Sequence, residues 1–157
     1  MFYGITLVIL LLDQLSKWWI RTHLQVGGSM EIWKGVLRFT HYENAGIAFS
    51  LLQGYGRWFV PVAVLFVLLI LYYRRRGMLG GRLGDAAAAF FVAGALGNAL
   101  DRLLFNQVTD FIAFDSSNGI LNLSDYALNI GLILFILDWL ISSICSSFSS
   151  TSRPSGR

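Results

Sequence analysis

Four long apolar segments constrain the fold of this chain more than any other feature. They lie near residues 3–20, 58–74, 85–104 and 125–145, and a helix of roughly 20 apolar residues spans the hydrocarbon core of a bilayer. Of the 157 residues, 55% are hydrophobic and only 13% are charged, whereas roughly a quarter of a soluble domain is charged. We therefore predict an all-α membrane protein with four transmembrane helices. Residues 1–157 would form a single membrane-embedded domain with a disordered tail from about 147 to 157.

An arginine-rich loop predicts the orientation of these helices. The segment YYRRRGMLGGR, residues 72–82, lies between the second and third apolar segments and holds four arginines. Loops of this kind stay in the cytoplasm under the positive-inside rule. Both termini then face the cytoplasm, and two longer loops, 21–57 and 105–124, lie outside. Within the first of these, residues 36–42 alternate in the period-two pattern of a strand, which predicts a small extracytoplasmic β-sheet element.

Composition and motifs exclude several classes of function. One cysteine, Cys145, and two histidines, His23 and His41, provide no recognisable metal-ligand set. The formal charge of +3 lies largely beside apolar segments, which indicates contact with a membrane surface and not with nucleic acid. Neither a GxSxG turn nor a phosphate-binding glycine motif is present in the sequence. We therefore expect no metal and no cofactor.

Polar side chains gather at one level of the predicted bundle, the outer ends of the apolar segments. An ionised group buried in the hydrocarbon region costs several kcal/mol, so a group of them at one depth requires mutual pairing or a function. The residues that share this level are Asp13 and Lys17 of the first segment, Asn98, Asp101 and Arg102 of the third, and Asn122, Asp125 and Asn129 of the fourth.

Each of these residues also has a purely structural interpretation. Asp13 and Lys17 are four residues apart on one helical face and could neutralise each other. Asp101 and its neighbour Arg102 could pair with nearby groups and fix helix packing. Either Asn122 or Asp125 could be only a helix N-cap.

Two aspartates on the predicted outer side, Asp110 and Asp125, are candidates for acid–base chemistry. Two carboxyl groups that lie close together share one proton, so one can act as a base toward water while the other donates a proton. The spacing in sequence does not show whether these two meet. The rival class is a small proton-coupled membrane transporter, but that class predicts polar groups on both sides of the midplane and an internal repeat, and neither is evident.

Five blocks of sequence, in order along nearly the whole chain, resemble the lipoprotein signal peptidases (signal peptidase II) of bacterial plasma membranes. The blocks are DQLSK from Asp13, ENAGIAFS from Glu43, GALGNALDR from Gly94, VTDFI from Val108 and LNLSDYALNIG from Leu121. The resemblance implies an aspartic endopeptidase, active near the extracytoplasmic surface, that cleaves just before a cysteine bearing a diacylglyceryl group.

Carried over residue by residue, the resemblance makes Asp110 and Asp125 the catalytic pair. It implies partners of two kinds, diacylglyceryl-modified prolipoproteins and membrane lipid, and we expect a monomer. A non-catalytic lipoprotein-binding factor is the remaining alternative, which only an activity assay separates from a peptidase. The residues for which the resemblance implies supporting roles are Asp13, Lys17, Asn44, Gly46, Asn98, Asp101, Arg102 and Asn122.

Overall fold

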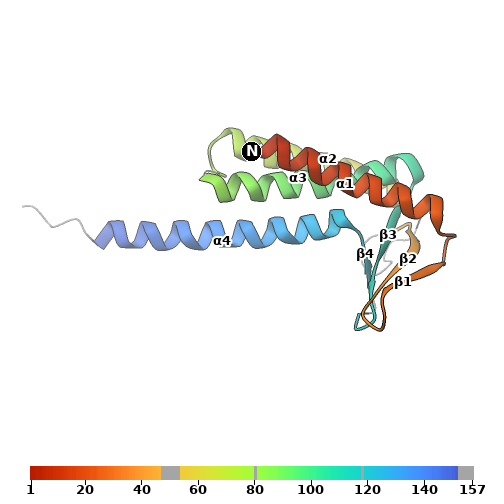
Figure 1. Ribbon diagram of the computed structural model, residues 1–157. Coiled ribbons are helices and arrows are strands. Elements are labelled where there is room, and N and C mark those ends of the chain that lie inside the picture. The colour runs from red at the N-terminus through yellow and green to blue at the C-terminus, as the bar shows by residue number, and fades with distance from the viewer. Residues whose placement is uncertain (47–53, 80, 118, 152–157) are drawn as a thin grey trace, which may run out of the picture.

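The computed structural model describes residues 1–46, 54–79, 81–117 and 119–151, with the main chain alone from 145 onward. Four long helices are joined to a small sheet at one end of the bundle (Figure 1). The helices are α1 (Phe2–His23), α2 (Phe59–Arg75), α3 (Gly81–Phe105) and α4 (Leu123–Thr151), and a 3-10 turn, η2 (Gly56–Trp58), precedes α2. The strands are β1 (Ser29–Trp33), β2 (Leu37–Asn44), β3 (Val108–Phe114) and β4 (Ile120–Leu121).

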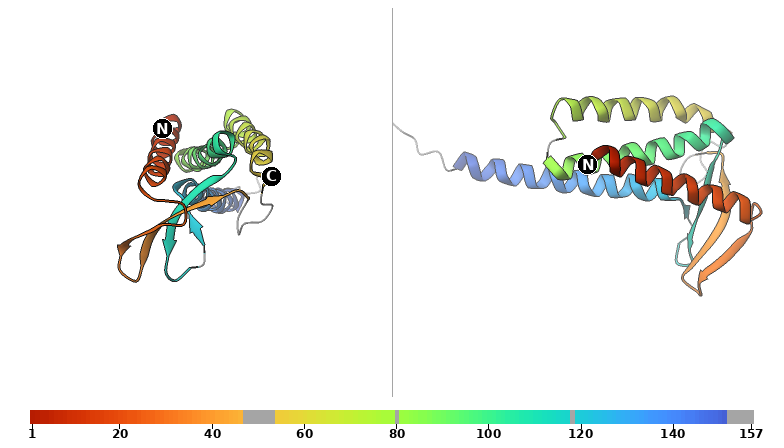
Figure 2. Two further views of the ribbon diagram at one scale, coloured as in Figure 1. Left: turned by 90° about the vertical axis from the view of Figure 1, so that its right-hand side faces the viewer. Right: turned by 45° about the horizontal axis from the view of Figure 1, so that its top comes forward.

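Helix α3 lies between the other three helices, as the end-on view in Figure 2 shows. Its buried face consists mainly of alanine and glycine, including Ala88, Ala93 and Gly94. Small side chains let neighbouring helices approach closely. A Cβ atom added to Gly94 would lie 2.5 Å from the carbonyl oxygen of Ser124 on α4. The small residues of α3 therefore set how closely the start of α4 packs against it.

Three helices of the described residues are long and apolar enough to cross a membrane. They are the segments Gly56–Arg75, Gly81–Phe105 and Leu123–Ile144. Helix α1 is not among them; its second half carries Asp13 and Lys17, both buried. The protein is therefore an integral membrane protein, and the span expected at residues 3–20, in α1, remains a prediction.

The predicted sheet element is confirmed and is larger than the sequence indicated. Strand β2 covers the expected residues 36–42 almost completely, and it belongs to a four-stranded antiparallel sheet with the order β1-β2-β3-β4. Strand β3 begins soon after α3 ends, and α4 begins directly after β4. The β3–β4 hairpin therefore connects the ends of two helices that pack together. At the other end, α4 continues to Thr151, beyond the boundary expected at about 147, while residues 152–157 lie outside the described residues.

Candidate active site

Asp110 is the third residue of β3, at the junction of the sheet and the bundle. Successive side chains of a strand point to opposite faces, so Asp110 and its neighbour Thr109 face in opposite directions. The side chain of Asp110 is buried, and Asn44 on β2 donates a hydrogen bond of 3.1 Å from Nδ2 to its Oδ2 atom. Residue 42 of β2 pairs directly with Asp110, which places Asn44 diagonally opposite on the same face of the sheet.

Asp125 lies in the first turn of α4, where it forms a reciprocal N-terminal cap with Asn122. The Oδ1 atom of Asn122 accepts the backbone N–H of Asp125 at 3.0 Å. In return, Oδ2 of Asp125 accepts the backbone N–H of Asn122 at 3.2 Å. This arrangement is a capping box, which satisfies two of the N–H groups that a helix start leaves free. The capping role considered from the sequence is therefore present, and it uses only one oxygen of Asp125.

Asn122 also joins the two aspartates. Its Nδ2 atom donates a short hydrogen bond of 2.6 Å to Oδ1 of Asp110, while its Oδ1 atom caps the helix that carries Asp125. Asn122 is completely buried. One amide thus contacts two carboxyl-bearing residues that are fifteen positions apart in the chain. The structure brings together the pair whose proximity the spacing could not predict.

The surroundings of Asp110 favour its protonated form. Burial raises the pKa of this carboxyl to about 7, and the nearby charge of Asp125 acts in the same direction. Hydrogen bonds from Asn44 and Asn122 to the carboxylate oppose these effects in part. Asp110 can therefore hold a proton near neutral pH, when an ordinary aspartate has lost it.

The second carboxylate oxygen of Asp125 accepts a hydrogen bond from a residue of α3. Asn98 donates from Nδ2 to Oδ1 of Asp125 at 2.8 Å, and its own Oδ1 accepts a hydrogen bond from Nζ of Lys17 at 3.0 Å. Because Lys17 fixes the orientation of the Asn98 amide, the nitrogen of that amide must point toward Asp125. Lys17 on α1 is thus linked to Asp125 through one intervening side chain.

Lys17 is the centre of a buried ion-pair cluster. Its Nζ atom lies 2.9 Å from Oδ2 of Asp13 and 3.1 Å from Oδ2 of Asp101, and all three side chains are fully buried. Asp13 reaches α4 as well, since its Oδ1 accepts the backbone N–H of Ser124 at 2.8 Å. The sequence-based pairing of Asp13 with Lys17 is confirmed, and the cluster also ties α1, α3 and the start of α4 together.

Among the described residues, Arg102 forms no ion pair with an aspartate, and it contacts Gly46 just beyond the end of β2. Its NH2 atom donates to the carbonyl oxygen of Gly46 at 3.1 Å. The backbone N–H of Gly46 donates in turn to Oδ1 of Asn44 at 3.0 Å, which leaves Nδ2 of that amide directed at Asp110. Arg102, Gly46 and Asn44 therefore form a chain of contacts that ends at Asp110.

Four residues of this region were missed by sequence reasoning. Arg21 donates from NH2 to Oδ1 of Asp101 and from Nε to Oγ1 of Thr109, both at 2.7 Å. Its position four residues after Lys17, on the same face of α1, was the available signal. Glu43 accepts from Thr109 at 3.0 Å and lies 2.6 Å from His41. His41 and Glu43 lie two residues apart on one face of β2, which was the available signal for that pair. No local pattern marks the contacts of Thr109, because they join β3 to β2 and to α1.

Not every polar residue at the predicted level joins the site. Asn129 is exposed on α4. Within the described part of the chain, no group of three histidine, cysteine, aspartate or glutamate residues could hold a metal ion.

A bundle of apolar helices joined to a small sheet, with the buried carboxyl group of Asp110 and the half-buried one of Asp125 linked through Asn122, defines a class of membrane-embedded enzyme, and solved structures agree. The chain is similar to a bacterial membrane enzyme with a TM-score of 0.84 and 27% identity, over 99% of this chain and 93% of that one. A second bacterial membrane enzyme matches with a TM-score of 0.77 and 29% identity, over 88% and 91% of the two chains.

Sequence comparison specifies the family. The model of the family described as signal peptidase (SPase) II matches residues 5–141. A lipoprotein signal peptidase from Shouchella clausii is 39% identical over 90% of this chain and 93% of its own length. One from Listeria welshimeri is 34% identical over 87% and 90%. The chain belongs to the signal peptidase II family, as its motifs predicted, and it is a protease.

Proposed function

We propose that this protein is an aspartic endopeptidase that removes the signal peptide from diacylglyceryl-modified prolipoproteins by cleaving just before the lipidated cysteine. The observation that carries the proposal is the convergence of Asp110 and Asp125 on one buried amide, that of Asn122. Membership of the signal peptidase II family and the names of the curated relatives supply the substrate class.

The two carboxyl groups can perform the hydrolysis as a pair with one shared proton. The ionised member takes a proton from a water molecule, and the oxygen of that water attacks the carbonyl carbon of the scissile peptide bond. The protonated member donates to the carbonyl oxygen as the tetrahedral intermediate forms. Collapse of the intermediate breaks the C–N bond, and the leaving nitrogen receives a proton from the pair. The raised pKa of Asp110 supports the presence of that shared proton near neutral pH.

The remaining predicted residues would position this pair. Asn44, held by Gly46 and Arg102, would orient Asp110. Asn98, oriented by Lys17, would orient Asp125. The ion pairs of Lys17 would in addition fix α1 against α3 at the level of the site. The other members of this supporting set are Asp13, Asp101 and Asn122.

Four spans and an extracytoplasmic active site are part of the proposal. The charged residues of α1 are buried against α3, while Leu7, Leu11 and Leu15 on the same helix are exposed, as a lipid-facing surface requires. With α1 as a span, the positive-inside rule applied to the arginine-rich loop 72–82 favours cytoplasmic termini and an extracytoplasmic sheet. A reporter enzyme fused to the C-terminus is expected to be active only as a cytoplasmic form, and activity of a periplasmic reporter would overturn this topology.

The position of the site near an apolar cavity supports a lipid-bearing substrate. A cavity of about 350 Å³ lies between α1 and the sheet, and it is lined by Ser16 and six large apolar side chains. Two of these, Phe111 and Ile112, directly follow Asp110 in β3. A monomer as the active form is part of the proposal.

Cleavage of a lipidated precursor peptide by the purified protein in detergent tests the proposal. Asp110→Asn and Asp125→Asn are each expected to reduce turnover by at least about 100-fold, because an amide cannot exchange the proton that acid–base catalysis requires. Asp115→Asn is the matched control: its carboxylate, paired with Arg38 at 3.5 Å, is partly exposed at the end of β3. Near-normal turnover of Asp125→Asn would reduce Asp125 to a helix cap, since asparagine caps as well as aspartate.

The same assay tests the substrate class. A precursor without the diacylglyceryl group is expected to be cut poorly, because binding energy from the remote acyl chains orients the scissile bond. Equal cleavage of both precursors would contradict the lipid requirement, and binding of the lipidated precursor without any cleavage would favour a non-catalytic binding factor.

A further inference from the structure

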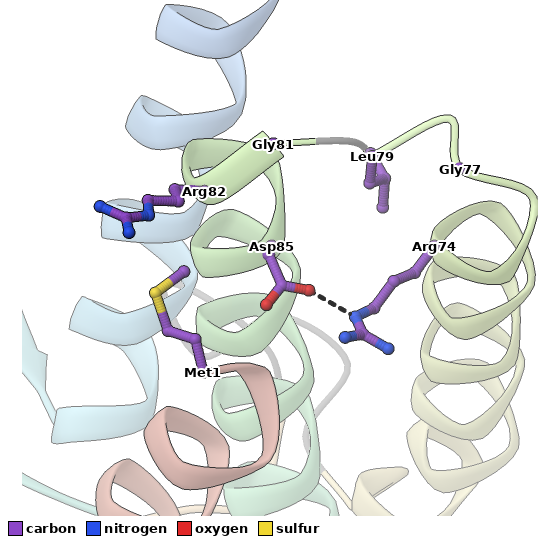
Figure 3. Close-up of a pocket in the computed structure, with 7 residues that line it drawn as sticks. All are labelled: Met1, Arg74, Gly77, Leu79, Gly81, Arg82 and Asp85. Atoms are coloured by element: carbon purple, nitrogen blue, oxygen red, sulfur yellow. Dashed lines mark hydrogen bonds and ion pairs between the residues drawn. The ribbon is translucent and has the colours of Figure 1, made fainter.

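A second pocket lies at the end of the bundle farthest from the sheet. There the start of α1, the end of α2 and the start of α3 come together (Figures 1 and 3). The pocket has a volume of about 650 Å³. It is separated from the candidate active site by most of the length of α3. Its lining residues are Met1, Arg74, Gly77, Leu79, Gly81, Arg82 and Asp85.

The pocket is basic in spite of its one carboxylate. Oδ1 of Asp85 accepts a hydrogen bond of 2.7 Å from Nε of Arg74, and its Oδ2 accepts the backbone N–H of Phe2 at 3.2 Å. The charge of Asp85 is thus balanced by Arg74 and by the positive end of the α1 dipole. Arg82 lies on the other side of Asp85 and forms no ion pair with any described residue, so the pocket carries excess positive charge (Figure 3).

Donors for an anion remain available around this pair. Arg74 uses only Nε toward Asp85, so its two terminal nitrogens have no hydrogen-bond partner among the described residues. Its guanidinium group is also held over the ring of Phe2, 4.2 Å from the centroid. A guanidinium group fixed in this way presents a planar fork that matches phosphate oxygens.

The main chain at the rim of the pocket also favours binding of an anion. Helix α3 begins at Gly81, and the N-terminus of a long helix presents free N–H groups and a partial positive charge. Gly81 and Gly77 both have positive φ angles, and a Cβ atom added to either would meet no atom within 4 Å. A ligand can therefore approach the main chain closely at these two glycines.

The surroundings of the pocket identify the source of such a phosphate as a lipid. Tyr3 on α1 and Tyr72 on α2 are exposed at the same end of the bundle, with 73% and 50% of their surfaces accessible. Exposed aromatic residues at this level are typical of the interface between lipid headgroups and acyl chains. Basic pockets between transmembrane helices at such an interface bind anionic headgroups.

We propose that this pocket binds the phosphate headgroup of an anionic phospholipid in the leaflet opposite the candidate active site. The phosphate lies between Arg74 and Arg82 at the start of α3, and the acyl chains follow the apolar faces of α1 and α2. Bound lipid therefore connects three helix ends and stabilises the folded bundle by mass action. This site is independent of peptidase chemistry, so its test does not depend on the proposed function.

The test measures the melting temperature of the full chain in uncharged detergent as phosphatidylglycerol or phosphatidylcholine is added. Phosphatidylglycerol is expected to raise the melting temperature saturably, and phosphatidylcholine is not. Arg82→Gln is expected to weaken the apparent affinity about fivefold, the effect of about 1 kcal/mol for one basic side chain near an anionic surface. The matched control is Arg75→Gln, which removes the same charge from an exposed residue that does not line the pocket.

Each other outcome overturns the proposal. An equal loss of apparent affinity for phosphatidylglycerol in Arg75→Gln and Arg82→Gln would show that the arginines attract anionic lipid non-specifically, without a defined binding site. Equal stabilisation by the two lipids would show that no headgroup is recognised. Competition by millimolar inorganic phosphate would identify a site for a soluble anion. Loss of the effect in Asp125→Asn, which leaves the pocket intact, would place the lipid in the candidate active site.

Discussion

Replacement of Lys17 by methionine tests whether the buried charges of the bundle are balanced as the structure shows. Two carboxylates, Asp13 and Asp101, and two cations, Lys17 and Arg21, contact one another in this cluster. Methionine preserves most of the volume and removes one positive charge. Asp101 keeps Arg21 at 2.7 Å, whereas Asp13 keeps no cation among the described residues.

The expected cost follows from that residual charge. Breaking a buried ion pair by removing one partner costs about 3–5 kcal/mol, because an uncompensated charge stays buried. Asp13 retains hydrogen bonds from Ser124 and Gln14, so we expect a value toward the lower end, about 3 kcal/mol. Adding Asp13→Asn to Lys17→Met restores charge balance, and the double variant is expected to recover at least half of the lost free energy of unfolding.

Reversible unfolding in mixed micelles, followed by circular dichroism, measures these free energies. Lys34→Met is the control, because Lys34 is an exposed lysine in the turn between β1 and β2 and its loss should change stability by at most about 0.5 kcal/mol. The reasoning is refuted if Lys17→Met costs less than about 1 kcal/mol, or if the double variant is no more stable than the single variant.

The remaining predictions concern the site and its support. Because the pKa of Asp110 is raised to about 7, the folded chain binds this proton more tightly than the unfolded chain between pH about 4 and 7. The contribution of Asp110 to the free energy of unfolding therefore falls as pH rises through that window. The free energy of unfolding is expected to change less with pH in Asp110→Asn than in the unsubstituted protein, and an unchanged pH dependence would contradict the raised pKa of Asp110. Asn122→Ala removes a helix cap and is expected to lower the free energy of unfolding by about 1 kcal/mol. It also removes a hydrogen bond to Asp110, so the cleavage rate is expected to fall at least about tenfold. If the rate falls only as far as the loss of folded protein accounts for, Asn122 has no positioning role. Gly94→Ala forces α4 away from α3 through the backbone of Ser124 and should cost about 1–3 kcal/mol in thermal unfolding, whereas Gly4→Ala, in open space on α1, should be neutral or stabilising. Treatment with EDTA should leave cleavage unchanged, and a loss of activity that a divalent ion restores would exclude a mechanism by carboxyl groups alone.

Local patterns in the sequence predicted much of the architecture. The apolar segments predicted the four helices closely, because hydropathy and helical periodicity are properties of neighbouring residues. The same reasoning predicted the pairing of Asp13 with Lys17, since residues four apart lie on one helical face. Five ordered motifs predicted the family that the comparisons then showed.

Contacts between distant segments were decided by the tertiary structure alone. Strand β3 carries Asp110, and its long pairing is with β2, which is separated from it in sequence by α2 and α3. The contact between Asp110 and Asn122 depends on how closely α4 packs against the small residues of α3. The hydrogen bonds from Lys17 to Asn98 and from Asn98 to Asp125 also require α1 to pack against α3 at the level of the site. The sequence by itself determined which polar residues share one depth, because depth follows from position along a helix. Which of these residues are in contact depended on the packing of three helices and a sheet. A hydrogen bond requires its donor and acceptor to lie about 3 Å apart, and no local sequence pattern specifies the distance between two segments with that precision.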